Sequence, residues 1–171
     1  MNTLMVQLTL ILHDLRSAHN VGAILRSADA TGVERVICSG STPYPRLLGD
    51  TRDPIVINRN TRAIAKTALG AERSVKVEHF DDTLAAIGHL RAQKYTIYGL
   101  EQTPKSTNLG SLSPRFPAAL IVGNEVAGLP ASVLATCDTV TEIPQRGTKE
   151  SLNVSVAAGI AMYALLDTTK A

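Results

Sequence analysis

Aromatic residues are scarce in this chain of 171 residues: tryptophan is absent, and Phe, Trp and Tyr together make up 4% of the sequence. The core therefore has to be built from Ala, Val, Leu and Ile, and few rings are available for stacking on single-stranded bases. This scarcity argues against a protein that binds nucleic acid mainly by base stacking.

Cysteine is also rare. The two residues, Cys38 and Cys137, lie far apart, form no CxxC pair and fall near the ends of apolar runs, which predicts buried free thiols in a reducing compartment. The N-terminus lacks the basic region and cleavage site of a signal peptide. No apolar run approaches the roughly 20 residues that span a bilayer. We therefore expect a cytoplasmic protein without a membrane segment.

Several common site motifs are missing. The chain has no GxGxxG after its first strand, no GxxxxGK[ST] and no HExxH, and no close His/Cys/Asp cluster predicts a metal site. His13 and Asp14 are neighbours in sequence, but that adjacency is not a catalytic triad. An ordinary dinucleotide-binding or phosphate-loop enzyme is therefore disfavoured.

The charge distribution is more informative than the net charge of +2, which is too small to indicate a nucleic-acid partner. One segment is distinctly basic, and a segment of this kind could follow a phosphate backbone. On charge alone, a solvated loop and helix face is the alternative. The basic residues of this segment are Arg46, Arg52, Arg59, Arg62 and Lys66.

Short apolar runs alternate with helical patterns over residues 1–171. This predicts a single α/β domain with a mainly parallel six-stranded sheet and helices on both faces. Strands are expected at Leu8–Leu12, Val33–Cys38, Val75–Val77, Tyr95–Leu100, Ala119–Val122 and Val140–Ile143. A first helix is expected from a cap at Asn20 to Gly32, followed after the second strand by a loop over Ser39–Asn60. A short helix is expected around Ile64 to Ala68, closed by Gly70, and another from a cap at Asp81 or Asp82, with Leu84, Ile87 and Leu90 on one side. The last two helices are expected over Pro130–Ala135 and Asn153–Leu166.

Three polar segments follow predicted strands, at the edge of the sheet where ligands tend to bind in α/β domains. The first contains Asn20, Gly22 and Arg26 and opens a helix. Glycine there allows close approach of another backbone, and the free amides can hold an anion such as an RNA phosphate. The alternative is a capped amphipathic helix with a surface arginine.

The second segment leaves a buried strand through Gly123, Asn124, Glu125 and Gly128. The pattern predicts a tight strand-to-helix turn that presents backbone polar groups and one carboxylate. A turn with ordinary helix-start residues is the alternative.

The third segment begins with Ile143-Pro144, crosses a polar loop and reaches a helix at Ser151-Leu152-Asn153. Either Ser151 or Asn153 is a natural N-cap. Capping accounts for one of these two polar residues more easily than for both.

In this order and spacing, the three segments resemble the SpoU (TrmH) family of RNA ribose 2′-O-methyltransferases, in the SPOUT class. The family pattern is N-x-G-x-x-x-R, then G-N-E-x-x-G, then I-P followed by S-L-N-V-S-x-A, and all three stand intact here. The resemblance covers nearly the whole chain and implies a C-terminal deep trefoil knot and a homodimer. Small residues of the last helix suit such an interface or a core equally well: Val154, Ala157, Ala158, Ala161 and Leu165.

The resemblance also implies S-adenosylmethionine as the cofactor, bent in the knot and held mainly by backbone groups. No metal is required, since the sulfonium supplies the electrophile. The positions that match the family's cofactor site are Leu100, Glu101, Gly123, Asn124, Ile143, Ser151, Leu152 and Asn153.

The implied reaction is an in-line displacement at the sulfonium methyl by a ribose hydroxyl. Arg26 matches the family's catalytic arginine. Because a guanidinium keeps its proton until a pH above about 12, we expect Arg26 to bind the target phosphate and stabilise alkoxide charge. Asn20, Glu125, Ser151 and Asn153 would complete the polar site, and the proton acceptor is one of them or water.

The stretch Glu101–Ser106 looks like the corresponding stretch in enzymes that methylate a D-loop guanosine of tRNA. This favours tRNA as substrate, with ribosomal RNA as the alternative. Those enzymes usually carry extra RNA-binding segments, whereas seven residues precede the first predicted strand here. RNA is therefore expected to be held by the catalytic domains themselves. The candidate RNA-binding residues are Arg26, Arg46, Arg52, Arg59 and Arg62.

Three other functions compete with this one: a knotted RNA-binding dimer without catalysis, an ordinary doubly wound nucleotide-binding enzyme, and the same chemistry at a base atom. The intact Arg26, Glu125, Ser151 and Asn153 argue against the first. The missing glycine fingerprint argues against the second, and the three motifs favour ribose over a base.

Overall fold

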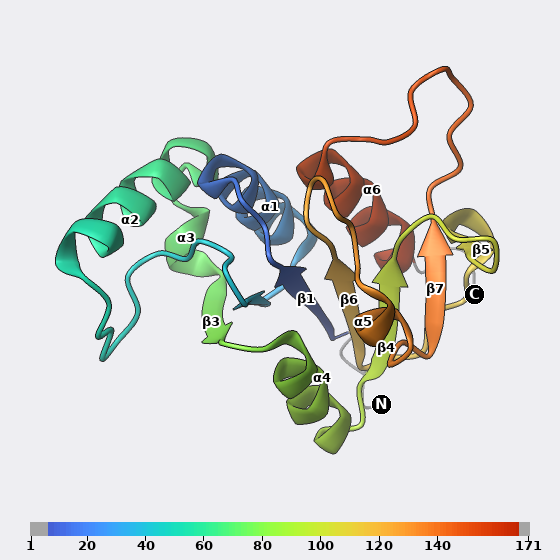
Figure 1. The fold of residues 1–171 in the computed structure, drawn as a ribbon, viewed down its shortest axis with the longest axis horizontal. Coiled ribbons are helices and arrows are strands. Elements are labelled where there is room, and N and C mark those ends of the chain that lie inside the picture. The colour runs from blue at the N-terminus through green and yellow to red at the C-terminus, as the bar shows by residue number, and fades with distance from the viewer. Residues whose placement is uncertain (1–6, 168–171) are drawn as a thin grey trace.

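One sheet of seven strands forms the centre of the computed structural model, which describes residues 7–167 (Figure 1). The strand order is β3-β2-β1-β6-β4-β7-β5, and all six strand pairings are parallel. The strands are β1 (Leu8–His13), β2 (Arg35–Ser39), β3 (Lys76–Phe80), β4 (Thr96–Leu100), β5 (Thr107–Asn108), β6 (Ala118–Val122) and β7 (Thr139–Glu142). The helices are α1 (Ala18–Thr31), α2 (Pro54–Ala68), α3 (Ala71–Ser74), α4 (Thr83–Ala92), the 3-10 helix η1 (Leu109–Ser111), α5 (Ala131–Leu134) and α6 (Val154–Leu166).

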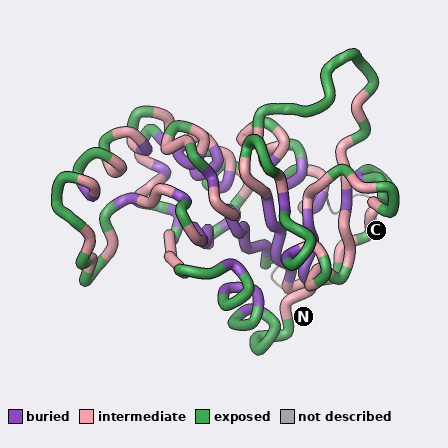
Figure 2. Tube along the Cα trace, viewed as in Figure 1, coloured by how far each residue is buried: buried purple, intermediate pink, exposed green. Residues whose placement is uncertain are grey.

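The central strands are apolar on both sides because each faces two separate cores. Leu10 and Leu12 of β1 pack with α1 and α6, whereas Ile11 packs on the opposite face with α4 and α5. All three side chains are fully buried, and Figure 2 shows the burial concentrated in the middle of the sheet. The predicted parallel sheet with helices on both faces is confirmed.

The predicted number of six strands is wrong by one. The additional strand β5 pairs with β7 at the edge of the sheet, with Thr107 opposite Thr141. It has two residues, and both are exposed. Such a short polar segment carries neither an apolar run nor an alternating pattern, so the sequence gives no signal for it.

Helix α2 is much longer than the predicted short helix, since it begins at Pro54 inside the predicted loop. The Asp53 carboxylate caps it by accepting from the Ile55 amide at 2.7 Å. Proline at the first helical position has a suitable φ and no amide to satisfy. Ile57 and Ile64 are buried seven residues apart on one face. The basic, polar composition of this segment led to the prediction of a loop, although Asp53-Pro54 is a helix-start signal.

The other helix boundaries follow local capping. Gly32 ends α1 in the left-handed conformation (φ 75), as predicted. Of the two candidates predicted for each cap, Asp82 caps α4 and Asn153 caps α6. The predicted cap of α1 at Asn20 is wrong. Ser17 caps this helix by accepting from the Asn20 amide at 3.2 Å, which leaves the Asn20 side chain for another contact.

Two smaller predictions are corrected. The C-cap of α2 is Leu69, which is left-handed (φ 52), and Gly70 is the N-cap of the following helix α3 instead of closing α2. Leu84 is 41% exposed, so the buried side of α4 is formed without it.

Both cysteines are free thiols. Burial raises the pKa of Cys38 to about 12 and that of the partly buried Cys137 to about 11, which makes both poor nucleophiles. Within residues 7–167, no helix is long and apolar enough to cross a bilayer. The same residues contain no group of three or more His, Cys, Asp and Glu side chains placed to hold a metal ion.

Candidate active site

The three polar motifs meet at one point, although Asn20 of the first motif lies more than 100 residues before Glu125 and Asn153 of the other two. The Asn20 side-chain amide donates to Glu125 Oε1 at 2.9 Å, across 105 positions. The Asn153 side-chain amide donates to Asn20 Oδ1 at 3.2 Å, across 133 positions. Asn20 of α1 therefore links the turn after β6 to the start of α6.

The Glu125 carboxylate is the anion that the start of α1 holds. It accepts from the Arg16 amide at 2.9 Å and the Ser17 amide at 3.1 Å, in addition to the Asn20 side chain. Partial burial by itself would raise the pKa of Glu125, but these N–H donors outweigh it and lower the pKa below its ordinary value. Glu125 is thus ionised at neutral pH, and its lone pairs are engaged, which suits positioning better than proton transfer.

Gly22 allows α1 and α2 to pack closely, as the sequence predicted for a glycine in this place. A Cβ at this position would collide with the Ile64 carbonyl and the Thr67 hydroxyl of α2. Thr67 also donates to the His19 carbonyl at 2.8 Å. The first motif therefore fixes α2 against α1, beside the polar cluster.

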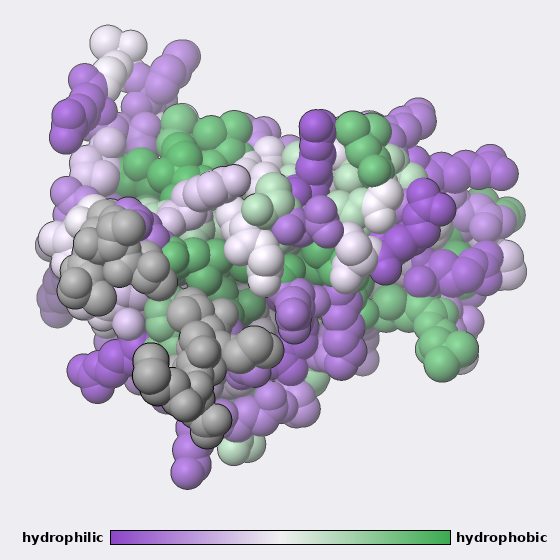
Figure 3. Space-filling view, turned by 180° about the vertical axis from the view of Figure 1, so that it is seen from behind, coloured by the Kyte–Doolittle hydropathy of each residue, from purple (hydrophilic) through white to green (hydrophobic). Residues whose placement is uncertain are grey.

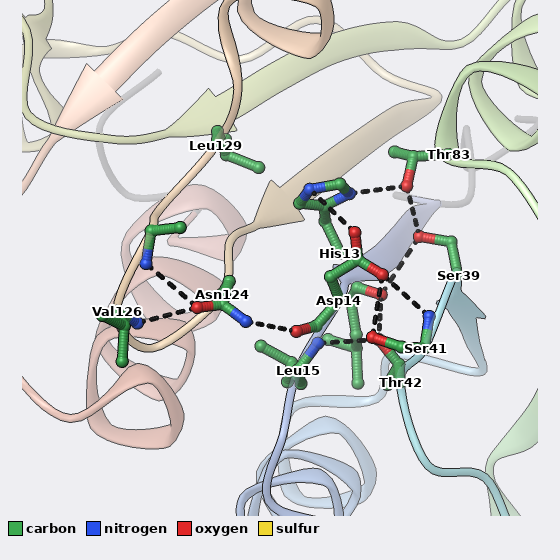
Figure 4. A network of polar contacts seen from close by, with 12 residues as sticks. His13, Asp14, Leu15, Ser39, Ser41, Thr42, Thr83, Asn124, Val126 and Leu129 are labelled. Atoms are coloured by element: carbon green, nitrogen blue, oxygen red, sulfur yellow. Dashed lines mark hydrogen bonds and ion pairs between the residues drawn. The ribbon is translucent and has the colours of Figure 1, made fainter.

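Asn124 holds the turn after β6 together and ties it to the end of β1. Its side-chain oxygen accepts from the amides of Val126 and Ala127, and its amide donates to the Asp14 carbonyl at 2.6 Å (Figure 4). The backbone of Asn124 exchanges two hydrogen bonds with Gly128. Asn124 thus positions Glu125, its neighbour in the chain.

The two glycines of this turn are required by space. A Cβ at Gly123 would collide with the Gly128 carbonyl, and Gly128 has φ 66 with the Glu101 carboxylate packed against it. The Glu101 carboxylate accepts from the amides of Leu129 (2.8 Å) and Gln102 (2.9 Å). Glu101 therefore joins the end of β4 to the same turn.

A polar network beside this turn holds the end of β1 (Figure 4). Asp14, which is left-handed (φ 49), accepts from the Ser41 amide at 2.7 Å. His13 Nδ1 lies 2.7 Å from Thr83 Oγ1, which lies 2.7 Å from Ser39 Oγ. Although Ser, His and Asp are all present, Ser39 is fully buried and unreachable as a nucleophile. The network has a structural role and fixes the carbonyl that Asn124 uses.

A cavity of about 100 Å³ lies at the carboxyl ends of β4 and β7. It contains five of the eight positions predicted to bind the cofactor, whereas Gly123, Asn124 and Asn153 do not line it. The lining residues are Leu100, Glu101, Gln102, Glu142, Ile143, Gln145, Ser151, Leu152 and Ala157.

Ser151 and Asn153 have separate tasks. Asn153 caps α6, since its Oδ1 accepts from the Ser155 amide at 2.9 Å and from the Ser155 hydroxyl at 2.6 Å. Ser151 is exposed at the edge of the cavity. Its hydroxyl makes no hydrogen bond to the part of the chain that the structure describes, so it is available to a ligand.

Arg26 lies apart from this cluster within one copy of the chain. It is exposed and borders a depression of about 560 Å³ that also contains Lys66 and Tyr163. Six helical positions place it about 9 Å along α1 from Asn20 and on another side of the helix. Between residues 7 and 167, no hydrogen bond connects Arg26 to Asn20, Glu125 or Asn153.

The predicted RNA-binding arginines of the basic segment differ in their surroundings. Arg46 donates to Asn58 Oδ1 at 3.1 Å, whereas the side chains of Arg59 and Arg62 are exposed without a partner among the described residues. Arg52 is fully engaged by its own loop. It pairs with Asp50 at 2.6 Å, donates to two loop carbonyls and lies 3.3 Å above the Tyr44 ring. These contacts give Arg52 a structural task, and its contact with RNA stays a prediction.

Replacing Arg52 with alanine is expected to lower the free energy of unfolding by about 3 kcal/mol, because the buried Asp50 carboxylate loses its cationic partner. The Asp50 side chain is 4% exposed, and hydrogen bonds from Arg52 hold its pKa far below the ordinary value. A depressed pKa stabilises the fold above the unfolded-state value near 3.9, and the benefit is lost as the pH falls below it. Urea unfolding at pH 7 measures the change. The exposed Arg62→Ala is the control, with a change below about 0.5 kcal/mol; equal values for the two variants would contradict the structural role.

A family model and similar known proteins indicate the same family. Residues 50–163 match the model of the SpoU rRNA Methylase family. The chain is 37% identical over 156 residues to a protein of Xylella fastidiosa named 23S rRNA (guanosine-2'-O-)-methyltransferase RlmB, covering 91% of this chain and 57% of that one. This chain therefore spans little more than half the length of that relative.

Solved structures share the fold. An AdoMet-bound rRNA methyltransferase from Sinorhizobium meliloti matches with a TM-score of 0.75 and 26% identity, covering 92% of this chain and 55% of that one. A TrmH/SpoU tRNA modifying enzyme of A. aeolicus matches with a TM-score of 0.77 and 25% identity, covering 97% and 77%. The similar proteins thus include both rRNA and tRNA enzymes.

Proposed function

This chain belongs to the SpoU methylase family, and from that premise we propose that it transfers a methyl group from S-adenosylmethionine to a ribose 2′-hydroxyl of RNA. The hydrogen-bonded contact of Asn20 with both Glu125 and Asn153 carries the proposal. It joins the three motifs whose order and spacing resemble the family pattern. A chain without this chemistry has no evident need to bring these polar side chains together.

The cavity at β4 and β7 is the proposed cofactor site. Leu100, Ile143 and Leu152 offer apolar contacts, and the Ser151 hydroxyl offers a polar one. When bound there, S-adenosylmethionine supplies the electrophilic methyl group. The cavity is smaller than the roughly 300 Å³ of ordinary ligand sites, so the loop over residues 144–152 must open to admit it. Residues 146–152 are all exposed, so the opening of this loop has a small free-energy cost.

The polar side chains of the motifs have different proposed roles in methyl transfer. Glu125 holds the turn between β1 and α1, Asn20 and Asn153 orient the acceptor hydroxyl, and Arg26 binds phosphate and stabilises alkoxide charge. The lowered pKa and the three N–H donors of Glu125 disfavour it as proton acceptor. We assign the role of proton acceptor for the ribose hydroxyl to a solvent water molecule that the free hydroxyl of Ser151 holds in place.

We also propose that residues 1–171 form a single domain whose C-terminal part is tied in a trefoil knot. After β7 the chain returns across the sheet to place α6 against α1. Helix η1, which lies between β4 and β6, packs on α6. Gln102 donates to the Glu150 carbonyl at 2.9 Å, which joins the two crossing loops. These contacts support the threaded path.

We propose a homodimer through the outer side of α6. The small residues considered for this role, Ala158 and Ala161, are fully buried in the core of the single copy. The exposed apolar residues are instead Val156 (51%), Ile160 (43%) and Tyr163 (62%), spaced four and three positions apart. Apolar residues gather over α6 in Figure 3. A second copy is the partner that this stripe fits, and Arg26, which borders the same depression as Tyr163, would lie at the interface.

Replacing Tyr163 with glutamate is expected to convert the dimer to a monomer at micromolar concentration, because a charge would be buried at the centre of the apolar stripe. Light scattering measures the mass. The control is Leu84→Glu, which adds the same charge at an exposed leucine on the opposite face. A wild type that is monomeric, or a Tyr163→Glu variant that stays dimeric, contradicts this interface.

For the substrate we propose tRNA, with a D-loop guanosine as the target, because of the stretch Glu101–Ser106. Ribosomal RNA is the second candidate, favoured by the 37% identity to the Xylella relative. Arg26, Arg46, Arg59 and Arg62 are the proposed RNA contacts, and the cytoplasm is the proposed compartment.

Labelled S-adenosylmethionine with separate pools of unmodified tRNA and ribosomal RNA tests the proposal. The RNA is digested to nucleosides and examined by mass spectrometry. A 2′-O-methyl nucleoside from one pool is the expected result and identifies the substrate class. A methyl group on a base overturns the ribose assignment, and failure to bind S-adenosylmethionine overturns the enzyme.

A further inference from the structure

A second and larger cavity lies over the carboxyl ends of β1, β2 and β3, beside the motif cluster. Its volume is about 690 Å³, within the usual range for sites that hold a molecule of nucleotide size. Four segments surround it: the turn before α1, the loop after β2, one side of α2 and the turn after β3. None of the positions predicted for the cofactor lines it.

The charges around this cavity favour an anion. Arg16 comes from the turn before α1 and Arg59 from α2, and both guanidinium groups are exposed without a partner in the described residues. His19 adds a third polar side chain. The one carboxylate in the lining is Asp81, and it lies 3.1 Å from His79 Nε2. Two uncommitted arginines with no opposing free acid suit a phosphate, which a guanidinium binds through paired N–H donors.

The part of the cavity wall formed by Tyr44, Arg52 and His79 is held in a fixed position. Tyr44 stacks on His79 with ring centroids 4.1 Å apart, and Arg52 covers the other face of Tyr44. Both faces of the Tyr44 ring are thus occupied within the protein. The loop is preorganised by these contacts, so binding here would not have to order it.

Apolar surface lies next to the cationic groups. Pro43, Val56 and Ala63 line the same cavity. A site with two arginines and small apolar side chains in one lining suits one nucleotide of RNA, with its phosphate at the arginines and its base against α2.

The position of Arg16 connects this cavity to the proposed reaction. Its backbone amide donates to Glu125 Oε2 at 2.9 Å, while its side chain lines the cavity. Arg16 therefore belongs both to the wall of this cavity and, through its backbone, to the Asn20–Glu125–Asn153 cluster. A nucleotide in the cavity would lie beside the cluster, which suits a nucleotide that flanks the methylated one.

We infer that this cavity is a subsite for an RNA nucleotide adjacent to the methylated ribose, and that Arg16 and Arg59 bind its phosphodiester. The inference rests on the proposed function and identifies a substrate contact that the motifs do not contain. It also assigns separate tasks within the basic segment. Arg59 faces the ligand, whereas Arg52 builds the wall.

Binding of unmodified tRNA transcripts to the full chain at 50 to 300 mM KCl tests the subsite. Arg16→Gln and Arg59→Gln are each expected to weaken binding on the order of tenfold at low salt and to reduce the slope of log K against log[KCl] by about 1. Ala63→Glu, which places a carboxylate inside the cavity, is expected to weaken binding as well. S-adenosylmethionine affinity should stay within twofold in all three variants.

Arg115→Gln is the matched control. It removes the same charge from an exposed arginine just before β6, at the amino end of that strand, whereas the cavity lies over the carboxyl ends of its neighbours, and should leave affinity and slope unchanged. Equal RNA affinity for Arg16→Gln, Arg59→Gln and Arg115→Gln, with methyl transfer intact in the wild type, overturns the subsite alone. A wild type that neither binds nor methylates tRNA or ribosomal RNA overturns the proposed function together with the subsite. Competition by free guanosine monophosphate as strong as that by RNA would identify a mononucleotide site and overturn the RNA assignment.

Discussion

Arg26→Ala is expected to lower the rate of methyl transfer by about 10³-fold or more, while S-adenosylmethionine affinity changes by no more than a few-fold. A preorganised cationic donor at a developing oxyanion typically contributes about 10²–10³-fold, and loss of the phosphate contact adds to this. The cofactor should be unaffected because Arg26 does not line the cavity at β4 and β7. Single-turnover transfer and calorimetric cofactor binding measure the two quantities.

Two further variants test whether the effect is specific to the guanidinium group of Arg26. Arg26→Lys keeps the charge but loses the planar fork of donors, so it should recover only part of the activity. Arg115→Ala removes an exposed arginine at the amino end of β6, away from the motifs at the carboxyl ends of the strands, and should retain full activity. Arg26→Ala with a tenth or more of the wild-type rate would remove Arg26 from the chemistry.

The position of Arg26 also links activity to assembly. Within one copy no hydrogen bond joins it to the Asn20 cluster, and it borders the same depression as Tyr163. If it acts at the interface, Tyr163→Glu should reduce transfer along with dimerisation. The variant should still bind S-adenosylmethionine, because the cofactor cavity is elsewhere on the chain.

The centre of the sheet could be predicted because β1, β2, β4 and β6 are largely buried and therefore appear as apolar runs. The meeting of the motifs could be anticipated for a related reason: parallel strands end at the same edge, so the turns after β1, β6 and β7 are neighbours. In contrast, β5 and the start of α2 carry almost no apolar signal. The sequence also did not show which side of α6 faces outward, since nearly all of its residues are apolar and periodicity gives no direction.

At the site, residue types were predictable and their partners were not. Glu125 is recognisable as a carboxylate in a turn, but two of its three donors are backbone amides, at Arg16 and Ser17, which no side-chain motif reveals. Asp14 was missed in the same way, because its carbonyl is the group that Asn124 binds. The spacing of Ser17 three positions before Asn20 was the available signal for the true cap of α1.

Glu125→Ala is the second variant with a large expected effect, a loss of transfer of about 10²-fold or more. It leaves the amides of Arg16 and Ser17 and the side chain of Asn20 without their acceptor. Asn20 is then free to move away from Asn153, and a displacement on the order of 1 Å in an active site costs about 10²-fold in rate. Measured rates should fall mainly in kcat, with S-adenosylmethionine binding largely retained.

The pH dependence separates positioning by Glu125 from proton transfer by it. A lowered pKa keeps the carboxylate ionised at neutral pH, and its clamp is lost only as the pH falls below the ordinary value near 4.3. Between pH 6 and 9, Glu125 should therefore add no inflection to the rate profile. Glu125→Gln should also be impaired, since its amide group would face N–H donors, whereas Val126→Ala, at a residue 79% exposed in the same turn, should be fully active. An acid limb near pH 6 to 7 that disappears in Glu125→Gln would show instead that Glu125 is the proton acceptor.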